Sequence, residues 1–587
     1  MEKWYVAAKR ADFKGIAQRF GIDQVTARII RNRDIVEESE IDKYLNGTVA
    51  DLYPPEKMKD IEKATELLIE KIKAKKRIRI IGDYDIDGVQ STYILYSALK
   101  RTGAVVDYAI PDRIADGYGV NTRLIEKAEE ESIDTILTCD NGIAAIEALE
   151  MAKEKGMTVI ITDHHEVPYE EGAQGKKNYI LPKADAIVNP KQADCDYPNK
   201  HLCGAAVAFK LVQVLYQKMG KEPSEAMEFL ENAAFATVGD VMDLTDENRI
   251  IVQEGLKRLN QTSNYGMRAL AAKNGIEIGN IKSYHIGFVL GPCLNASGRL
   301  DTAKRALELL LAEDEKKASE CAADLYDLNA SRKELTEQGV EQAKALVEQS
   351  EIKEDKVLVI YLPECHESLA GIIAGRIREQ YHRPVFVLTK GEEGVKGSGR
   401  SIEGYSMYEE MIKCSSLFTK FGGHPMAAGL SMAEENVALF RKKMNENASL
   451  TEEDLLPKIM IDVPMPLDYI SKELIEELKV LEPFGKANEK PVFADKNIRI
   501  LSMRILGKNK NVCKMQVESQ AGTKMDAVYF GDIEEMFSYY REKYGEQELQ
   551  KVSHGGNGNI KASFVYYPEI NEYNGRESLQ IIVKNYC

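Results

Sequence analysis

Residues 77–88 have the sequence RIRIIGDYDIDG, in which an apolar segment leads into three carboxylates at alternate positions and a glycine. This pattern fits a calcium loop, part of a catalytic metal site or a solvated turn. In an EF-hand loop, Asp83, Asp85 and Asp87 would be positions one, three and five, and position twelve would be a glutamate. Position twelve is Ile94, and the preceding segment has the pattern of a strand rather than a helix. The calcium loop is therefore excluded, and the other two explanations remain.

Segments with strand and helix patterns alternate on both sides of this stretch. Residues 60–73 repeat apolar side chains at intervals of three and four, which predicts an amphipathic helix. The strands predicted after it are RIRIIG, AVVDYAIP, IDTILTCDNG and MTVIITDHHE, with a helical segment between each pair. This rhythm predicts a parallel sheet with right-handed crossovers, whose strand carboxyl ends meet at one ligand-binding edge.

Acidic residues and histidines follow three of the predicted strands at the point where each strand ends. They are Asp83, Asp85 and Asp87, then Asp140 with Asn141, then Asp163, His164 and His165. Carboxylates combined with imidazoles favour Mn²⁺ or Mg²⁺, and two such ions about 3.5–4 Å apart suit the hydrolysis of a phosphodiester or pyrophosphate. Neighbouring side chains on an extended segment point to opposite sides, so His164 and His165 are expected to have different partners.

The composition is that of a folded chain with several domains. The chain has 587 residues, of which 44% are hydrophobic, and about 150 residues per domain suggests roughly three to five domains. The 78 basic and 94 acidic side chains give a net charge of −16. This charge argues against a protein that coats nucleic acid through bulk positive charge, but it allows a local basic channel.

The cysteines and the apolar runs indicate a cytoplasmic protein. The nine cysteines are scattered without a C-x-x-C pair, so reduced thiols are expected. Cys195, His201 and Cys203 are one ligand short of a structural zinc site, so zinc is a disfavoured alternative. No apolar run approaches the roughly 18 residues of a membrane span, and the first twenty residues lack a signal-peptide core.

The rest of the chain predicts further domains. Residues 303–349 are helical and charged, as in a spacer between two globular bodies, and a second alternating α/β unit follows. Near the end, five strand segments with one helix between the third and fourth predict an OB-type barrel, a fold that often binds single-stranded nucleic acid. The expected class is α/β with this barrel appended. The expected boundaries are 1–65, a lead segment, then 66–250, 251–352, 353–455 and 456–587.

Several motifs resemble those of the DHH phosphoesterase superfamily in order and spacing. They are GDYDIDG, PDRIADGYG, TCDNGI and ITDHHE. Further along, TVGDVMDL, LNASGRL, GSGRS, FGGHPMAAGL and LEPFGKANEKPVF are similar to motifs of the single-strand-specific exonucleases within it. The resemblance covers about residue 77 to the C-terminus, and it implies a DHH domain, a DHH-associated domain and the barrel.

The resemblance implies a site for two Mn²⁺ or Mg²⁺ ions. The metal ligands would be Asp85, Asp87, Asp140, His164 and Asp240. Asp83 would be an outer ligand, and His165 would meet the scissile phosphate. Asp83, Asp140 and His165 are accordingly the residues expected to take part in catalysis.

A second group of residues would bind the 5′ phosphate and the DNA. By resemblance, Arg113, Ser398 and Arg400 would form the 5′-phosphate pocket, because hydroxyl and guanidinium groups converge well on phosphate oxygens. Arg299 and His424 would be further DNA or phosphate contacts. In the barrel, the basic residues expected to hold the strand are Arg504, Lys508, Lys510 and Lys514. Its tyrosines, among them Tyr566, Tyr567 and Tyr573, are more typical of a barrel core than of a stacking surface.

Two departures from the family pattern bear on the site, and a third, LCGAAV (202–207), where a more glycine-rich run is common, is expected to be a packing change. Ile81 stands where many members have a histidine, so one ion would have fewer protein ligands. HESLAGIIAGRI, from His366 to Ile377, replaces a run similar to HPGVVGIVASRL, so the contacts of that turn are expected to differ.

The resemblance implies a metal-dependent 5′-to-3′ exonuclease that acts on single-stranded DNA, releases 5′ mononucleotides and serves recombination and repair. It also implies a monomer, with a helicase and a single-strand-binding protein as candidate partners. The alternative is a DHH phosphodiesterase that acts on short oligonucleotides or cyclic dinucleotides. An inactive DNA-binding scaffold is disfavoured, because every acid of the first, third and fourth motifs is retained.

Overall fold

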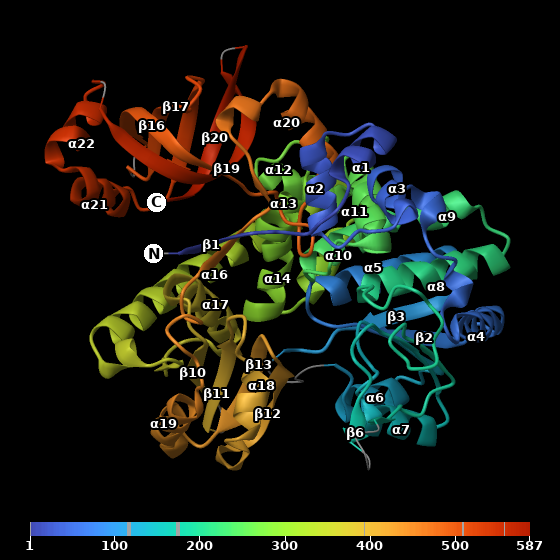
Figure 1. The fold of residues 1–587 in the computed structure, drawn as a ribbon. Helices are drawn as coiled ribbons and strands as arrows, with labels where there is room; N and C mark the ends of the chain where they lie inside the picture. Colours follow the sequence, from blue (N-terminus) through green and yellow to red (C-terminus); the bar gives the residue numbers. More distant parts are fainter. Residues whose placement is uncertain are drawn as a thin grey trace. The chain divides into compact units, whose positions relative to one another are not determined.

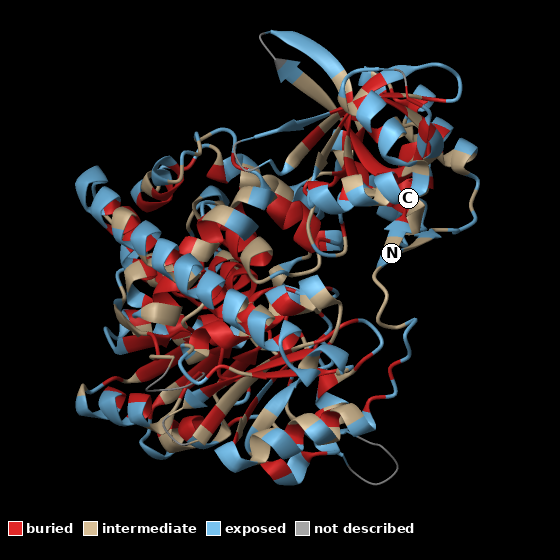
Figure 2. Ribbon diagram, turned by 90° about the vertical axis from the view of Figure 1, so that its left-hand side faces the viewer, coloured by how far each residue is buried: buried red, intermediate tan, exposed pale blue. Residues whose placement is uncertain are grey.

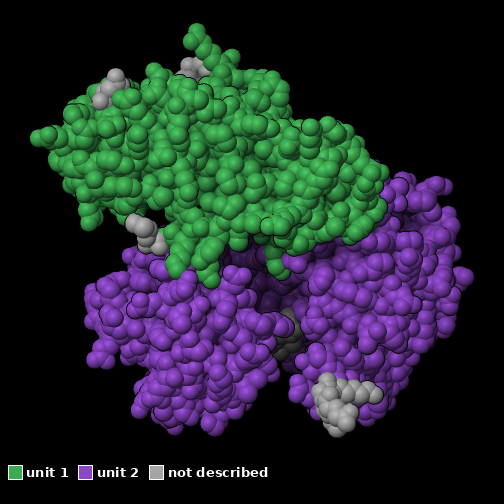
Figure 3. Space-filling view, viewed as in Figure 1, with its two compact units in different colours: residues 1–47, 458–587 green, residues 48–457 purple. Residues whose placement is uncertain are grey.

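The computed structural model describes residues 2–113, 119–171, 177–391, 394–507, 510–556, 558–573 and 575–587. The chain forms two compact units, one of residues 48–457 and the other of residues 1–47 and 458–587 (Figure 3). Part of the PDRIADGYG motif (114–118), Lys508 and the side chain of Tyr573 lie outside the described part. None of the helices described has the length and apolar composition that a membrane span requires.

The predicted parallel sheet is present in the first unit (Figure 1). Its strand order is β3 (Val105–Ala109), β2 (Arg77–Ile81), β4 (Thr135–Cys139), β5 (Thr158–Thr162) and β8 (Ala186–Val188), and every neighbouring pair is parallel. The order reverses between β2 and β4, and the crevice at such a switch point is where doubly wound sheets bind their ligands. The Asp83–Asp87 loop follows β2 at this point.

Helices cover both faces of this sheet. On one face, α4 (Ile61–Lys73), α5 (Ile86–Arg101) and α8 (Gly204–Lys218) share an apolar cluster with Ile78 and Ile80. On the other face, α6 (Thr122–Glu130) and α7 (Ile146–Glu154) share a cluster with Ile136 and Ile161. The strands are therefore buried on both sides, which explains why they are continuous apolar runs (Figure 2).

The predicted helical spacer is present as α15 (Lys304–Leu310) and the long helix α16 (Glu315–Glu348). Leu325, on the first half of α16, packs in a cluster with α12 (Tyr265–Lys273) and α14 (Gly291–Leu300). On its second half, Ala343 and Val347 pack with the second α/β domain. The helix thus contributes to the cores of both domains that it joins.

The second α/β domain has a five-stranded mixed sheet. The order is β12 (Phe418–His424), β13 (Ala427–Met432), β11 (Gly394–Arg400), β10 (Val385–Gly391) and β9 (Leu358–Tyr361). Only β9 and β10 pair in parallel. Helix α17 (Ala370–Tyr381) packs against this sheet through Ile373 and Ile377.

The other unit contains the predicted barrel. Strands β16 (Phe493–Leu506), β17 (Val512–Glu518), β18 (Lys524–Phe530), β20 (Arg576–Tyr586) and β19 (Ile560–Tyr573) pair in that order, and β19 closes the ring onto β16. The OB-type prediction is confirmed. The helix predicted between the third and fourth strands is present as α21 (Ile533–Tyr544). A second helix, α22 (Glu546–Ser553), which the sequence did not predict, follows it after Gly545, at a φ of 83°.

The first 47 residues belong to the barrel's unit. Strand β1 (Lys3–Val6) pairs in parallel with β14 (Lys458–Ile461). Helices α2 (Gln24–Asn32) and α3 (Glu38–Asn46) contribute Ile29, Ile30 and Ile41 to the cluster that fills the barrel's unit. Residues 48–65, which the sequence groups with this segment, fall in the other unit.

Candidate active site

The first motif closes a tight turn from β2 into α5. Asp85 caps the helix, since its Oδ1 atom accepts hydrogen bonds from the backbone N–H groups of Asp87 and Gly88 at 3.0 Å each. A Cβ atom on Gly88 would lie 2.5 Å from the Asp83 carbonyl oxygen. Only glycine therefore allows the helix to begin beside the three carboxylates.

The N-terminus of α8 holds the third carboxylate of the motif. The backbone N–H groups of Gly204 and Ala205 donate to Asp87 Oδ2 and Oδ1 at 2.6 and 2.7 Å. A Cβ atom on Gly204 would lie 2.7 Å from Asp140 Cβ, so this glycine lets the helix end approach both acids. Asp140 itself adopts a left-handed φ of 59° directly after β4. This conformation is one that Asp and Asn adopt more readily than most residues.

The predicted metal ligands lie together. Three groups each place one ligand atom per residue within 4.8 Å of the others: Asp83, Asp85 and Asp140; Asp87, His164 and Asp240; and Asp140, His164 and His165. His164 Nε2 lies 3.0 Å from Asp140 Oδ1, 3.5 Å from Asp87 Oδ2 and 3.9 Å from Asp240 Oδ2. Asp240 comes from the end of α10 (Leu230–Gly239), outside the sheet. The structure therefore brings all five predicted ligands and both predicted catalytic partners to one place.

Several carboxylates of this cluster are buried close enough to repel one another. Burial, followed by repulsion from neighbouring aspartates, raises the pKa values of Asp83, Asp85 and Asp140. Within the described residues, Asp83 Oδ1, Asp140 Oδ1 and His164 Nδ1 are buried without a hydrogen-bond partner. A buried set of oxygen and nitrogen donors with unsatisfied atoms matches the ligand set of hard divalent cations. The residues present therefore fit the ions that the sequence implies.

The rings of the two histidines do not point to opposite sides, although their shortest carboxylate contacts differ: His164 Nε2 is nearest Asp140 and His165 Nδ1 is nearest Asp163. Their ring centroids are 4.4 Å apart, and the rings of both approach Asp140. The chain bends here because Asp163 Oδ1 accepts hydrogen bonds from the backbone N–H groups of His164 and His165. The same oxygen lies 2.8 Å from His165 Nδ1. Both imidazoles consequently face one site.

Asp163 holds His165 in place, a role that the sequence did not assign. Burial raises the pKa of the Asp163 carboxyl, but the hydrogen bond to His165 and the two imidazoles outweigh it, and the pKa falls to about 2. Burial lowers the pKa of His165, whereas the bond to Asp163 raises it, and the net value is about 9. The available signal was the acid directly before the histidine pair, since such carboxylates commonly orient imidazoles.

Beside the carboxylates, a pocket of about 400 Å³ opens between the two α/β domains of this unit. Arg113 and Ser398 line it together with Tyr84, Lys396 and Lys420. The Arg113 guanidinium lies over the Tyr84 ring, 4.8 Å from its centroid. The pocket therefore combines hydroxyl and cationic groups next to the first motif.

Two more predicted arginines lie next to this pocket. Arg299 Nη1 donates to the carbonyl of Ser368, one of the lining residues, at 2.8 Å. A Cβ atom on Gly371 would lie 2.8 Å from Arg400 Nη2, so the glycine in HESLAG makes room for this guanidinium. The fifth predicted residue, His424, is exposed at the end of β12 and is not among the side chains lining the pocket.

The arginines repel one another. Burial, and then the nearby guanidinium groups of Arg113, Arg332 and Arg400, lower the pKa of Arg299 to about 10. Arg332, on α16, was not predicted, because nothing in its local sequence separates it from the other charges of that helix. Glu367, which also lines the pocket, pairs with Lys396 at 2.9 Å. The arginines are partly buried and repel one another, which favours the binding of an anion among them.

The two departures from the family pattern have structural outcomes. Ile81 is fully buried in the apolar cluster formed with α6 and α7. His366 caps the turn before α17, with its Nδ1 atom 2.7 Å from Ser368 Oγ. The turn thus orders Ser368, whose carbonyl binds Arg299. Cys195 and Cys203 are buried, and none of the metal-capable groups in the described ranges includes them.

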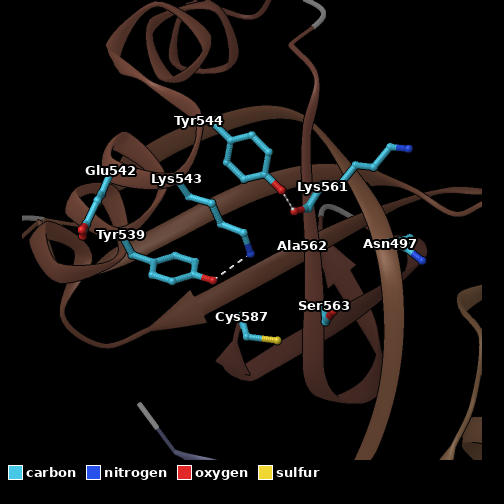
Figure 4. Close-up of a pocket in the computed structure, with 9 residues that line it drawn as sticks. All are labelled: Asn497, Tyr539, Glu542, Lys543, Tyr544, Lys561, Ala562, Ser563 and Cys587. Carbon is cyan, nitrogen blue, oxygen red and sulfur yellow. Dashed lines mark hydrogen bonds between the residues drawn. The ribbon is translucent and has the colours of Figure 1, made fainter.

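The barrel unit has a pocket of its own, of about 770 Å³ (Figure 4). The Lys543 ammonium donates to Tyr539 Oη at 2.9 Å and lies 5.8 Å from the Tyr544 ring centroid. Lys561 lines the other side, on β19. By contrast, Tyr566 and Tyr567 are buried in the core, as the sequence suggested.

Three family models match the chain. The DHH family N-terminal domain matches residues 77–237, the DHHA1 domain matches residues 354–450, and the RecJ OB domain matches residues 461–585. The first two, together with the carboxylate and histidine cluster, define a DHH-class phosphoesterase.

Comparison with individual relatives identifies the family within this class of phosphoesterases. The chain is 35% identical over 588 residues to the single-stranded-DNA-specific exonuclease RecJ of Bacillus subtilis, covering 99% of this chain and 70% of the relative. It is 35% identical to the RecJ of Haemophilus influenzae, covering 95% of each. The crystal structure of Thermus thermophilus RecJ with Mn²⁺ has a TM-score of 0.80 at 27% identity, covering 100% of this chain and 79% of that one. The chain belongs to the RecJ family.

Proposed function

We propose that this chain is a metal-dependent exonuclease that degrades single-stranded DNA from the 5′ end and releases 5′ mononucleotides, in DNA recombination and repair. Its curated relatives from Bacillus subtilis and Haemophilus influenzae carry the name of a single-stranded-DNA-specific exonuclease. The observation that carries the proposal is the convergence of Asp85, Asp87, Asp140, His164 and Asp240 at one sheet edge.

The cofactors would be two Mn²⁺ or Mg²⁺ ions held by those five side chains. Crystal structures of Thermus thermophilus RecJ are described as complexes with Mn²⁺ and with Mg²⁺. When bound, two such ions would supply activation of a water molecule and stabilisation of the leaving oxygen. Asp83 would support the ligands from behind. His165, oriented by Asp163, would donate a hydrogen bond from Nε2 to the scissile phosphate.

The pocket lined by Arg113 and Ser398, with Arg400 next to it, would explain why the enzyme acts at a 5′ end. A terminal monophosphate carries more negative charge than an internal phosphodiester and offers three oxygens to Arg113, Arg400 and Ser398. Burying an anion there would relieve the repulsion that lowers the pKa of Arg299. The pocket and the carboxylates share the first motif through Tyr84, so a strand held by its terminal phosphate would present its first phosphodiester to the catalytic edge.

The barrel unit would hold the strand farther from its 5′ end. OB folds commonly bind single strands by combining cationic and aromatic side chains. The pocket lined by Tyr539, Lys543, Tyr544 and Lys561 supplies both kinds. A phosphodiesterase restricted to short oligonucleotides or cyclic dinucleotides would not require a second unit to bind a long strand, so we do not favour that alternative.

The enzyme would act as a monomer in the cytoplasm, beside a helicase that supplies single strands and a protein that coats them. Nine unpaired cysteines agree with a reducing compartment. A nuclease that rejects duplexes depends on another activity to unwind them.

One comparison of substrates tests the proposal. With Mn²⁺ present, the enzyme should shorten 5′-phosphorylated single strands and release mononucleotides, leave blunt duplex intact, and lose at least about a thousandfold in rate on Asp140→Ala. Product ladders of strands labelled at the 3′ end would show the polarity. Equal attack on duplex, or activity confined to dinucleotides, would contradict the proposal.

A further inference from the structure

Two aromatic rings are highly exposed on the unit of residues 48–457, which also contains the predicted metal ligands. Phe288 is 70% exposed and Tyr284 is 61% exposed, the highest values for large hydrophobic side chains in the described part of the chain. Their ring centroids are 5.1 Å apart with planes at 27°, so the two rings stack. A stacked pair facing water presents a flat apolar surface that the fold itself does not use.

The backbone under this pair is irregular. Tyr284 lies on the short helix α13 (Ser283–His285), and Phe288 lies on the following π-helical turn η4 (Ile286–Leu290). Turns of this kind are frequently found at functional sites. A Cβ atom on Gly287 would lie 3.9 Å from Val238 Cγ1, so the turn packs on the last turn of α10, which ends at Gly239, directly before Asp240.

A strained residue lies three positions after Val238, which the turn contacts. Val241, directly after Asp240, has a φ of 56° and is 60% exposed. A β-branched residue in the left-handed region is an outlier, and such outliers cluster at functional sites. The turn that carries Phe288 therefore packs three residues from this strained position, which directly follows a metal ligand.

The helix that follows the pair leads past the catalytic edge to the phosphate pocket. Along α14, Asn295 Oδ1 accepts a hydrogen bond from the Ile86 N–H, between Asp85 and Asp87, at 2.9 Å. Near the end of α14, Arg299 binds Ser368 of the pocket wall. Eleven residues separate Phe288 from Arg299, which is about 16 Å along a helix. The aromatic pair, the metal edge and the phosphate pocket thus lie in this order along one helical run.

We propose that Tyr284 and Phe288 form a stacking surface for the bases of the strand being degraded, on the 3′ side of the scissile bond. The inference deepens the proposed function and rests on it. Single-stranded DNA is the occupant that the placement favours, because a strand anchored at Arg299 and cut at Asp85 and Asp87 must leave past the aromatic pair. At about 3.4 Å per stacked nucleotide, the pair would meet roughly the third to fifth base.

The dependence of KM on substrate length distinguishes a base-stacking role of the two rings from a structural role. Base stacking on an aromatic side chain is sequence-tolerant and worth about tenfold or more in affinity per base. Tyr284→Ala/Phe288→Ala should therefore raise KM for 5′-phosphorylated 20-mers about tenfold or more, at an unchanged kcat. Dinucleotide binding, measured by competition, should stay within twofold of the wild type. Tyr284→Phe should retain most of the affinity, because the ring is kept.

The matched control is another exposed aromatic pair on the same body. Tyr169 and Tyr179, on the hairpin of β6 (Tyr169–Glu171) and β7 (Lys177–Tyr179), are 43% and 47% exposed with ring centroids 6.1 Å apart. Tyr169→Ala/Tyr179→Ala should leave KM unchanged for 20-mers and dinucleotides alike.

A fluorescence experiment tests the contact without turnover. In an Asp140→Asn background with Mn²⁺, 2-aminopurine placed at each of the first eight positions should change its emission most near the third to fifth, and Tyr284→Ala/Phe288→Ala should remove that change. An unchanged KM for 20-mers, or a rise of the same size for dinucleotides, would overturn the inference. So would a dimer that the substitutions dissociate without an effect on KM. A wild type that binds strands in this way but does not cut them would overturn the proposed activity and leave the stacking surface standing.

Discussion

Two clusters of buried charge lie in the same body and are built in opposite ways. At the first, Lys210 of α8 and Glu247 of α11 (Asp246–Leu259) are both fully buried, and Lys210 Nζ lies 2.5 Å from Glu247 Oε1. At the second, Asp83 and Asp140 are equally buried among other acids. The first cluster pairs a cation with an anion, whereas the second gathers several acids of the same sign.

The Lys210–Glu247 cluster is complete. Tyr197 Oη donates to both Glu247 oxygens at 2.9 and 2.8 Å, the Tyr53 N–H donates at 3.0 Å, and Lys210 also donates to the Tyr53 carbonyl at 2.8 Å. A buried ion pair whose hydrogen bonds are satisfied in this way holds helices in register and requires no bound ion or ligand. The catalytic edge, in contrast, leaves carboxylate oxygens unbonded. Burial alone therefore does not identify a functional site, whereas burial without partners does.

The largest effect on stability should come from breaking the complete cluster. Lys210→Met leaves Glu247 charged and buried without its cation, so the free energy of unfolding should fall by about 3–5 kcal/mol. Denaturant titration followed by circular dichroism measures this change. Lys210→Met/Glu247→Gln keeps an acceptor for Tyr53 and Tyr197 and should recover most of the loss. A double variant as unstable as the single one would show that packing, not charge, dominates this site.

Substitution in the carboxylate cluster of the catalytic edge should raise stability, whereas substitution in the Lys210–Glu247 cluster should lower it. Without divalent ions, Asp140→Asn should raise the free energy of unfolding by about 1–2 kcal/mol, because it removes one of several mutually repelling carboxylates. Asparagine is the suitable replacement, since it tolerates the left-handed backbone at this position. Adding Mn²⁺ at about a hundred times its Kd should stabilise the wild type by about 2.7 kcal/mol and the variant by less. Thermal melting in EDTA and in Mn²⁺ measures both; a variant less stable than the wild type in EDTA would contradict the comparison.

The smallest effect should come from an intermediate case, Glu231 on α10. Burial raises its pKa to about 7, and the hydrogen bond that its Oε1 atom accepts from Thr262 Oγ1 at 2.7 Å offsets only part of this. The folded state holds the proton up to about pH 7, whereas the unfolded state loses it near pH 4.5. The carboxyl group therefore lowers stability progressively from pH 4.5 to 7, and the full cost is present above pH 7.

Glu231→Gln removes that titration. The variant should match the wild type below pH 4.5 and exceed its free energy of unfolding by about 1 kcal/mol at pH 8, after solvent screening is allowed for. Unfolding curves at pH 4, 6 and 8 would reveal the trend. A difference independent of pH would mean that the amide acts through packing rather than through charge.

The sequence predicted the parts of this molecule that depend on local pattern. Apolar runs with acids at their ends located the parallel sheet and its edge. This was possible because the periodicity of apolar residues and the ends of strands depend on residues that are adjacent in the sequence. The orientation of His164 and His165 was not predictable in this way, since Asp163 bends the chain through side-chain bonds that compete with extension. Arg332 and the Tyr284–Phe288 pair were missed because their roles depend on which distant residues the tertiary fold brings near them.

The pairing of β1 with β14 has a consequence for synthesis. Residues 1–47 leave the ribosome well before the strands and apolar side chains that they pack against, which begin at Lys458. At roughly 5–20 residues per second, translating the intervening 410 or so residues takes on the order of 20–80 s. During that time the residues from 48 to 457 can fold, while Ile29, Ile30 and Ile41 lack their partners. The nascent N-terminal helices are therefore a predictable client for a holding chaperone.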